Sequence, residues 1–291
     1  MPLRTSILGS IIALLVGLIV AFTASQNSID FYGIPFLFFC FIYSYVIHWI
    51  FFIHAYSKQT EHYFDAIGSF TFISLSIIVF SYTRNFYSLI IGFLVMIWTI
   101  RLGSFLFNRI KKSGRDTRFT EMKKNFFWFF MTWNLSALWV FLSYVAGLVA
   151  MTSINVIDIG IKEYIFLIFG VLIWVIGFLI EVISDYQKKI FREDIANRDK
   201  FISHGLWAWS RHPNYFGEIL LWIGITIIAL PIFKSWDYIA LISPIFIYYL
   251  LVKVSGIPML EKSANEKWGN DPNYITYKKN TTILFLRKPI E

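Results

Sequence analysis

The residues best suited to chemistry lie in one short segment, 205–218, which leads into an apolar run. Five side chains with different chemistries fall within it: Arg211, His212, Asn214, Tyr215 and Glu218. Pro213 disfavours helical geometry at His212 and is favoured in the first turn of a helix. That helix would present unpaired N–H groups and the positive end of its dipole, which suit an anion or an amide. The sequence therefore predicts a ligand site where this helix begins.

A second group of polar side chains lies in the turn 57–65 between two apolar runs, and it includes Glu61, Tyr63 and Asp65. Such groups can donate a proton or a hydrogen bond to a carbonyl oxygen. Tyr87, at the start of a later apolar run, is a further candidate donor. An ordinary solvated loop is the alternative interpretation of the turn.

Three charged residues fall within or at the end of apolar runs, where charge is costly and usually functional. Arg101 lies well inside the fourth run, and a guanidinium at that depth requires a carboxylate or a ligand phosphate as its partner. Glu181 and Asp185 stand four residues apart near the end of the sixth run, so they share one helix face. The alternative is that these side chains extend from the ends of their helices to water.

The elements that must position these groups are membrane-spanning helices. The chain has 291 residues, of which 57% are hydrophobic and 15% charged, whereas soluble domains carry about 25% charged residues. Most of its apolar runs have about the 20 residues needed to cross a bilayer as a helix. The runs fall near 7–25, 34–54, 66–82, 87–107, 126–150, 163–184, 215–233 and 238–254. We therefore expect an all-α, polytopic bundle of seven or eight spans, because one of the shorter runs could be re-entrant.

The distribution of Lys and Arg indicates the orientation of the spans. With eight spans and both termini in the cytoplasm, 22 of these residues lie on the cytoplasmic side and three on the other. The positive-inside rule favours this arrangement. The abundance of Ile, Lys and Asn indicates an AT-rich genome and favours a bacterial inner membrane. The first run follows Arg4 and lacks a small-residue cleavage site, so we interpret it as a span rather than a signal peptide.

Three basic segments are expected to meet on the cytoplasmic side, at 108–118, at 186–214 and in the tail 255–291. Such a face can hold a phosphate-bearing ligand. About half of the net charge of +8 would follow from orientation and anionic lipid headgroups alone, and no nucleic acid is needed to explain it. Without repeats or flexible linkers, the chain is predicted to be one integral membrane domain, 1–291, whose basic loops and tail form a cap over a cofactor. Its oligomeric state leaves no sequence signal.

Neither a disulfide nor a metal site is expected. Cys40 is the single cysteine and lies inside the second run. His54, His62 and Glu61 do not have the spacing of a helical pair of metal ligands. We therefore predict that no metal takes part.

The segment from Gly205 to Glu218 resembles the steroid 5-alpha-reductase-like membrane enzymes of bacteria. The resemblance runs from about residue 60 to the end and includes the tail. Its tail residues are Glu261, the run Trp268 to Pro272, Tyr274 and Tyr277. Further upstream it includes Ser184, Asp185 and Tyr186 with the later Arg192, the span residue Arg101, and the triplet Gly114, Asp116 and Arg118.

The resemblance implies NADPH as the cofactor and a double bond conjugated to a ketone as the group reduced. The substrate would be a hydrophobic small molecule that enters from the surrounding membrane lipids. The implied cofactor-binding residues are Arg101, Arg109, Arg118, Asp185, Arg192, Arg211, His212, Asn214, Tyr215, Glu218, Tyr274 and Tyr277. The candidates that would stabilise the enolate oxygen are Glu61, Tyr63, Asp65 and Tyr87.

Two alternatives remain at this stage. The core Arg211-His212-Pro213 with Tyr215 also resembles sterol reductases and membrane methyltransferases of the isoprenylcysteine carboxyl methyltransferase type, which use S-adenosylmethionine. That cofactor has no phosphate, so the many arginines favour NADPH. A transporter or structural membrane protein would explain the spans but not the Arg-His-Pro-Asn-Tyr turn.

Overall fold

The computed structural model describes residues 2–114, 116–155 and 160–289, and Ser113 and Thr117 by their backbone only. Arg115 of the predicted basic segment and the last two residues of the predicted tail lie outside this part. Within it, eight helical segments are long and apolar enough to cross a membrane. They are Leu3–Ala24, Phe36–Ser57, Phe64–Thr83, Phe86–Lys112, Phe126–Thr152, Ile161–Glu193, Pro213–Ile232 and Ser235–Trp268. The predicted all-α polytopic bundle of an integral membrane protein is confirmed.

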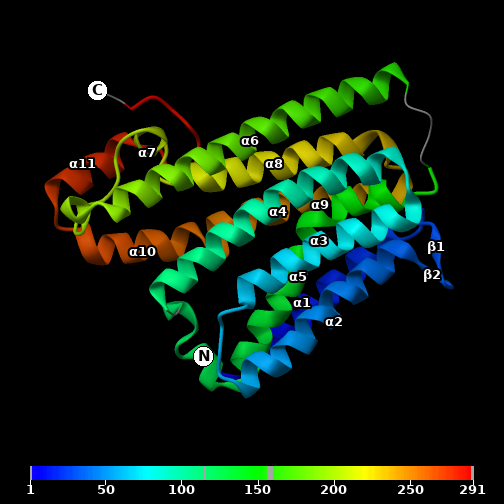
Figure 1. Ribbon diagram of the computed structural model, residues 1–291, viewed down its shortest axis with the longest axis horizontal. Coiled ribbons are helices and arrows are strands. Elements are labelled where there is room, and N and C mark those ends of the chain that lie inside the picture. Colours follow the sequence, from blue (N-terminus) through cyan, green and yellow to red (C-terminus); the bar gives the residue numbers. More distant parts are fainter. Residues whose placement is uncertain (1, 115, 156–159, 290–291) are drawn as a thin grey trace. The chain divides into compact units, whose positions relative to one another are not determined.

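The helices follow the predicted runs closely (Figure 1). They are α1 Leu3–Ala24, α2 Phe36–Ser57, α3 Phe64–Thr83, α4 Phe86–Ser113, α5 Phe126–Thr152, α6 Ile161–Glu193, α7 Leu206–Trp209, α8 Pro213–Ala229, α9 Ile242–Tyr249, α10 Ile257–Trp268 and α11 Pro272–Asn280. The 3₁₀ turns are η1 Thr117–Phe119, η2 Met122–Lys124, η3 Ile195–Asn197, η4 Leu230–Ile232 and η5 Ser235–Leu241, and the π turn is η6 Leu250–Val254.

Several boundaries differ from the sequence-based expectation, and the local structure explains two of them. The second span begins at Phe36 rather than 34, because β1 Asp30–Phe31 and β2 Ile34–Pro35 form a small antiparallel hairpin. Tyr32 and Gly33 both have positive φ values in its turn, as tight hairpins favour. The sixth span continues to Glu193, because backbone hydrogen bonds extend α6 through the charged residues that follow its apolar part.

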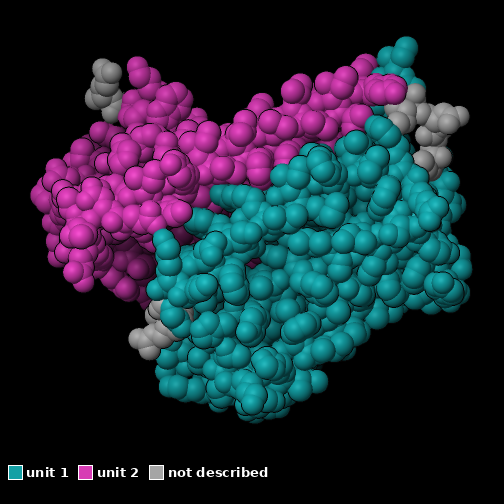
Figure 2. Space-filling view, viewed as in Figure 1, with its two compact units in different colours: residues 1–163, 229–243 teal, residues 164–228, 244–291 magenta. Residues whose placement is uncertain are grey.

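The chain forms two compact units, shown in different colours in Figure 2. Unit 1 comprises residues 1–163 and 229–243, and unit 2 comprises residues 164–228 and 244–291. In unit 1, α5 is the central helix and packs against α1, α2, α3 and α4. Most of its span is buried, in contrast to the lipid-accessible α1. Aromatic side chains fill the contacts around it, including Phe52, Phe129 and Trp133.

In unit 2, α6 and α8 run side by side at unusually close range (Figure 1). A Cβ on Gly177 would lie 2.6 Å from the Gly217 carbonyl oxygen, and a Cβ on Gly217 would lie 2.6 Å from that of Gly177. Gly170 and Gly224 make the same kind of contact one heptad away. The two pairs run in opposite order along the chain, so the helices are antiparallel. Small residues permit this approach of helix backbones in membranes.

A Gly177→Ala substitution is therefore expected to destabilise the protein by about 1–3 kcal/mol, because the methyl group would overlap backbone that cannot move aside independently. Gly92→Ala is the matched control, since a Cβ there would find its nearest atom at 3.6 Å. Unfolding of both variants in detergent gives the comparison. Equal stability of the two variants would contradict the proposed role of the glycine contact.

Candidate functional site

The segment before α8 is shaped by Ser210 and Pro213. Ser210 is extended, and its hydroxyl oxygen accepts a hydrogen bond from the His212 N–H at 3.1 Å. The same hydroxyl donates to the carbonyl oxygen of Leu284 at 2.7 Å. Pro213 then opens α8, as the sequence predicted. The C-terminal segment is thereby tied to the turn, a connection that residue spacing alone did not indicate.

Asn214 and Asp185 meet, although 29 positions separate them in the chain. The Asn214 side-chain amide donates to a carboxylate oxygen of Asp185 at 3.2 Å. Asp185 lies on α6 and Asn214 in the first turn of α8, so the close approach of these two helices brings them together. Both were predicted to bind the cofactor. Their contact gives that prediction a defined location.

Glu261, on α10, binds two residues of the Arg-His-Pro motif at once. Its carboxylate accepts from Arg211 Nη1 at 2.5 Å and contacts His212 Nε2 at 2.9 Å. Glu261 belongs to the tail pattern quoted above, but it was not among the predicted site residues. Its spacing from the motif gave no periodic signal, because the contact spans 49 residues.

The Glu261 contact defines the state of the His212 ring. Burial lowers the pKa of His212, although the hydrogen bond to Glu261 acts in the opposite direction. We therefore take the ring as neutral near pH 7, with its proton on Nε2 and directed at the Glu261 carboxylate. The Nδ1 atom is then a hydrogen-bond acceptor.

Three polar atoms in this turn are buried without a hydrogen-bond partner among the described residues. They are Arg211 Nε, His212 Nδ1 and Asn214 Oδ1. A buried polar group without a partner costs about 1–3 kcal/mol. Three such atoms within four residues, one a donor and two acceptors, are typical of a site that a ligand completes.

The remaining motif residues surround this turn. The Tyr215 ring is stacked on the His212 ring, with centroids 5.8 Å apart. Glu218 lies one turn further along α8 and is buried. Ahead of the turn, the Trp207 indole N–H donates to the Ser184 carbonyl oxygen at 2.9 Å. These contacts fix the helix face that carries Asp185.

The two tail tyrosines, Tyr274 and Tyr277, pack against the segment 201–209. The Tyr277 hydroxyl donates to the Trp207 carbonyl oxygen at 2.7 Å. The Tyr274 ring packs against Phe201, with centroids 5.1 Å apart. Burial raises the pKa of both phenols, so they stay neutral. Their predicted contact with a cofactor remains a prediction, while their observed role is to hold α11 against the segment 201–209.

The basic residues on α6 extend the face that carries Asp185. Lys188 and Arg192 follow it by three and seven positions, so all three side chains leave the same side of the helix. The Lys188 ammonium lies 4.4 Å from the centre of the Trp207 ring. Arg192 is exposed near the end of α6. Lys188 was not among the predicted site residues, although its spacing from Asp185 would have identified it.

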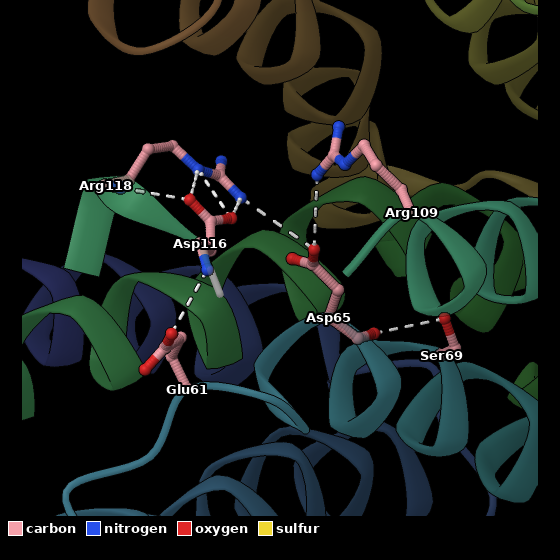
Figure 3. A network of polar contacts seen from close by, with 6 residues as sticks. All are labelled: Glu61, Asp65, Ser69, Arg109, Asp116 and Arg118. Atoms are coloured by element: carbon pink, nitrogen blue, oxygen red, sulfur yellow. Dashed lines mark hydrogen bonds and ion pairs between the residues drawn. The ribbon is translucent and has the colours of Figure 1, made fainter. Parts of the chain in front are cut away.

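In unit 1, the turn 57–65 is part of a network of charged groups (Figure 3). The Glu61 carboxylate is almost fully buried, accepts from Lys123 Nζ at 2.6 Å and accepts from the Asp116 N–H at 3.1 Å. The Asp116 carboxylate in turn is paired with Arg118 at 2.5 Å. These contacts fasten the turn to the segment that follows α4.

Asp65 belongs to the same network and lies between two arginines, as Figure 3 shows. Its carboxylate is 3.8 Å from Arg109 and 3.8 Å from Arg118. Both arginines were predicted to bind cofactor phosphates. The structure gives them carboxylate partners within unit 1, so a phosphate would have to share or replace these contacts.

The network favours the charged form of Glu61 and Asp116. Burial would raise the pKa of Glu61, but the hydrogen bonds from Lys123 and from the Asp116 backbone hold it below its usual range. Burial acts likewise on Asp116, and Arg118 lowers its pKa below the usual value. Glu61 therefore accepts hydrogen bonds as a carboxylate in this network, and its expected role in the reaction stays a prediction.

The other predicted residues of unit 1 do not gather at one place. Tyr63 lies at the turn and exposes half of its side chain. Tyr87 is buried near the start of α4, at the opposite end of the α3–α4 pair. Because α3 has 20 residues, about 30 Å separates these ends. Arg101 lies between them, with its guanidinium 5.6 Å from the Phe105 ring centre.

No cluster of three or more His, Cys, Asp or Glu side chains in the described part of the chain could hold a metal ion. Cys40 is buried within α2.

Comparison with known proteins places the chain in a family. Residues 50–281 match the family described as "Protein of unknown function (DUF1295)", and the chain belongs to this family. A stretch of 104 residues is 25% identical to the "Probable O-methyltransferase ustE" of Ustilaginoidea virens. It covers 33% of this chain and 37% of that protein, so little more than a third of the relative is matched. No solved structure matches the chain.

Removing the partner of Glu61 tests the charged network. Lys123→Met is expected to cost about 3 kcal/mol of stability, because it leaves a buried carboxylate unpaired. The double variant with Glu61→Gln should recover part of this loss. Lys124→Met is the control, since its pair with Glu121 is largely exposed and should contribute little. Equal losses in the two single lysine variants would show that the buried pair has no special role.

Proposed function

We propose that this member of the DUF1295 family is a membrane enzyme that reduces a double bond conjugated to a ketone, with NADPH as its cofactor. The substrate would be a hydrophobic, steroid-like or isoprenoid lipid that reaches the protein from the bilayer. The observation that carries the proposal is the α6–α8 site. There, three buried atoms that have no hydrogen-bond partner in the described part of the chain lie beside a helix face that continues from Asp185 into Lys188 and Arg192.

The unpaired atoms fit a carboxamide such as that of the nicotinamide ring. Arg211 Nε can donate to its carbonyl oxygen, while His212 Nδ1 and Asn214 Oδ1 can each accept from its N–H groups. Asp185 holds Asn214 from the other side and so selects the orientation of the amide side chain. When bound, NADPH supplies the hydride that reaches the β-carbon of the conjugated ketone.

Phosphate groups provide the second part of the fit. Lys188 and Arg192 place two cations on the helix face that leads away from the Asp185–Asn214 contact. An arginine fork matches the geometry of a phosphate group, and a lysine provides a compact charge. S-adenosylmethionine has no phosphate and would leave these two residues without a purpose in binding.

The group that stabilises the substrate oxygen is proposed to be a tyrosine. Glu61 and Asp65, two of the four candidates, already lie beside cations. Tyr63 and Tyr87 remain, and neither hydroxyl takes part in a hydrogen bond with the described residues. One well-placed donor of this kind can contribute roughly a hundredfold to the rate.

A methyltransferase is the second candidate, because the relative from Ustilaginoidea virens is named a probable O-methyltransferase. In that case the same turn would bind S-adenosylmethionine, and the acceptors His212 Nδ1 and Asn214 Oδ1 would face its amino groups. The two candidates differ in their need for the basic residues of α6.

The cofactor is tested by the thermal stability of the detergent-purified protein with NADPH, NADH or S-adenosylmethionine, because a ligand of the native state raises the melting midpoint. We expect a selective shift with NADPH. Asn214→Ala and Arg192→Ala should each weaken NADPH binding about tenfold, which is a loss of roughly 1.4 kcal/mol. Arg198→Ala is the control, because this exposed arginine lies outside the site.

A selective shift with S-adenosylmethionine that Arg192→Ala leaves unchanged would replace the reductase by the methyltransferase. Unchanged NADPH affinity in both Asn214→Ala and Arg192→Ala would remove the cofactor assignment.

The variants Tyr63→Phe and Tyr87→Phe show which tyrosine is the donor. The measurement is the turnover of an enone lipid. The variant that removes the donor should lower kcat roughly a hundredfold while NADPH affinity stays the same. The other variant serves as the matched control, because each change deletes a single hydroxyl. Unaltered turnover in both variants would exclude a tyrosine as the donor.

A further inference from the structure

A cleft in unit 1 lies apart from the residues used above for the cofactor. It has a volume of about 370 Å³ and is formed by the last turns of α4 and the turn between α2 and α3. Its walls are formed by Thr60, His62, Tyr63, Phe107, Ile110, Lys111 and Gly114, so the cleft borders one of the two candidate donors, Tyr63. Its lining thus combines aromatic and aliphatic surface with hydroxyl, imidazole and ammonium groups.

Hydrogen bonds hold the walls of the cleft in place. His62 Nε2 donates to the Gly114 carbonyl oxygen at 3.0 Å, and His62 Nδ1 contacts the Thr60 hydroxyl at 2.8 Å. Gly114 has a φ of 74° and ends α4, with its N–H donated to Ile110. This left-handed conformation favours glycine. The cleft is therefore formed by the fold before any ligand arrives.

Lys111 gives the cleft its charge. Its ammonium group makes no ion pair or hydrogen bond within residues 2–114, 116–155 and 160–289. The nearby carboxylates of Glu61, Asp65 and Asp116 each have a lysine or arginine partner already. The positive charge at the cleft is consequently available for an anion.

An apolar stripe on α4 leads to this charge. Leu89, Phe93, Ile100 and Phe107 expose between 44% and 56% of their surface. Their spacings of four, seven and seven residues place them on one side of the helix. Lys111 follows Phe107 by four residues, so it caps the same stripe. The stripe fits hydrocarbon chains, and its end fits an anionic headgroup.

We propose that the cleft binds the phosphate of an anionic phospholipid, whose acyl chains lie along the α4 stripe. Lys111 pairs with the phosphate oxygen, and Phe107 covers the start of the chains. A soluble phosphate would have the same contact with Lys111 but would gain nothing from the stripe. A phospholipid whose chains lie along the stripe presents its headgroup at Lys111 at a high effective concentration, which favours the lipid as the source of the phosphate.

Native mass spectrometry of the detergent-purified, full-length protein tests this site with three probes: phosphatidylglycerol, phosphatidylcholine and glycerol 3-phosphate. We expect tightest binding of phosphatidylglycerol. Lys111→Gln should raise its apparent Kd about tenfold, the effect of losing roughly 1.4 kcal/mol, and Lys111→Arg should retain most of the affinity. Lys112→Gln is the matched control, because this neighbouring cation does not line the cleft.

Three outcomes would overturn the proposal. Equal weakening by Lys111→Gln and Lys112→Gln would indicate general attraction to the basic surface, and unchanged affinity in Lys111→Gln would exclude this cleft. Glycerol 3-phosphate that binds as tightly as the lipid would identify a soluble phosphate as the ligand. A melting curve of each variant shows that the protein is folded, so loss of binding cannot be confused with loss of structure.

Discussion

The contact on which the candidate site depends is the approach of two helix backbones at paired glycines. Gly177 and Gly217 leave no room for a Cβ between α6 and α8, and Gly170 and Gly224 repeat the contact further along. In a membrane, apolar side chains gain little by leaving lipid for protein, so close packing of small residues becomes a main source of helix association. Asn214 is three positions from Gly217, and the glycine contact thereby sets the distance from Asn214 to Asp185.

Ion pairs then hold the charged residues of the site in place. Glu261 neutralises Arg211 and directs the His212 proton to Nε2, and one donor and two acceptors of the motif are buried without a hydrogen-bond partner among the residues that the structure describes. In unit 1 the same principle operates on a different set of residues, where Lys123 and Arg118 keep Glu61 and Asp116 ionised. A buried charge is tolerated only with a partner, because removing it from water costs several kcal/mol. Glu61, Asp116 and Glu261 are accordingly each paired with a cation.

The ion pairs distinguish between arginines that the sequence pattern did not distinguish. Arg109, Arg118, Arg192 and Arg211 all lie in predicted basic segments. Arg109 and Arg118 lie beside Asp65, and Arg211 is paired with Glu261. Arg192 extends the face of α6 that bears Asp185. The four candidates for stabilising the substrate oxygen also fall into two groups. Glu61 and Asp65 are held by cations, while Tyr63 and Tyr87 lie at opposite ends of the α3–α4 pair.

The positions of the helices and of the turn that starts α8 could be predicted from the sequence. Long apolar runs fix span positions because each helix satisfies its own backbone hydrogen bonds, so length and hydropathy suffice to locate it. The Pro213 start was predictable for the same reason, since it depends on backbone geometry within a few residues. Family membership over residues 50–281 agrees with the part of the chain in which the motifs were found.

Which charged groups form ion pairs could be seen only in the tertiary structure. Glu261 reaches His212 across 49 residues, and Lys123 reaches Glu61 across 62. No helical or strand periodicity extends over such distances, because it arises from neighbouring positions on one element. The pairing depends instead on how separate helices pack, and that packing determines which side chains are already satisfied and which remain open to a ligand.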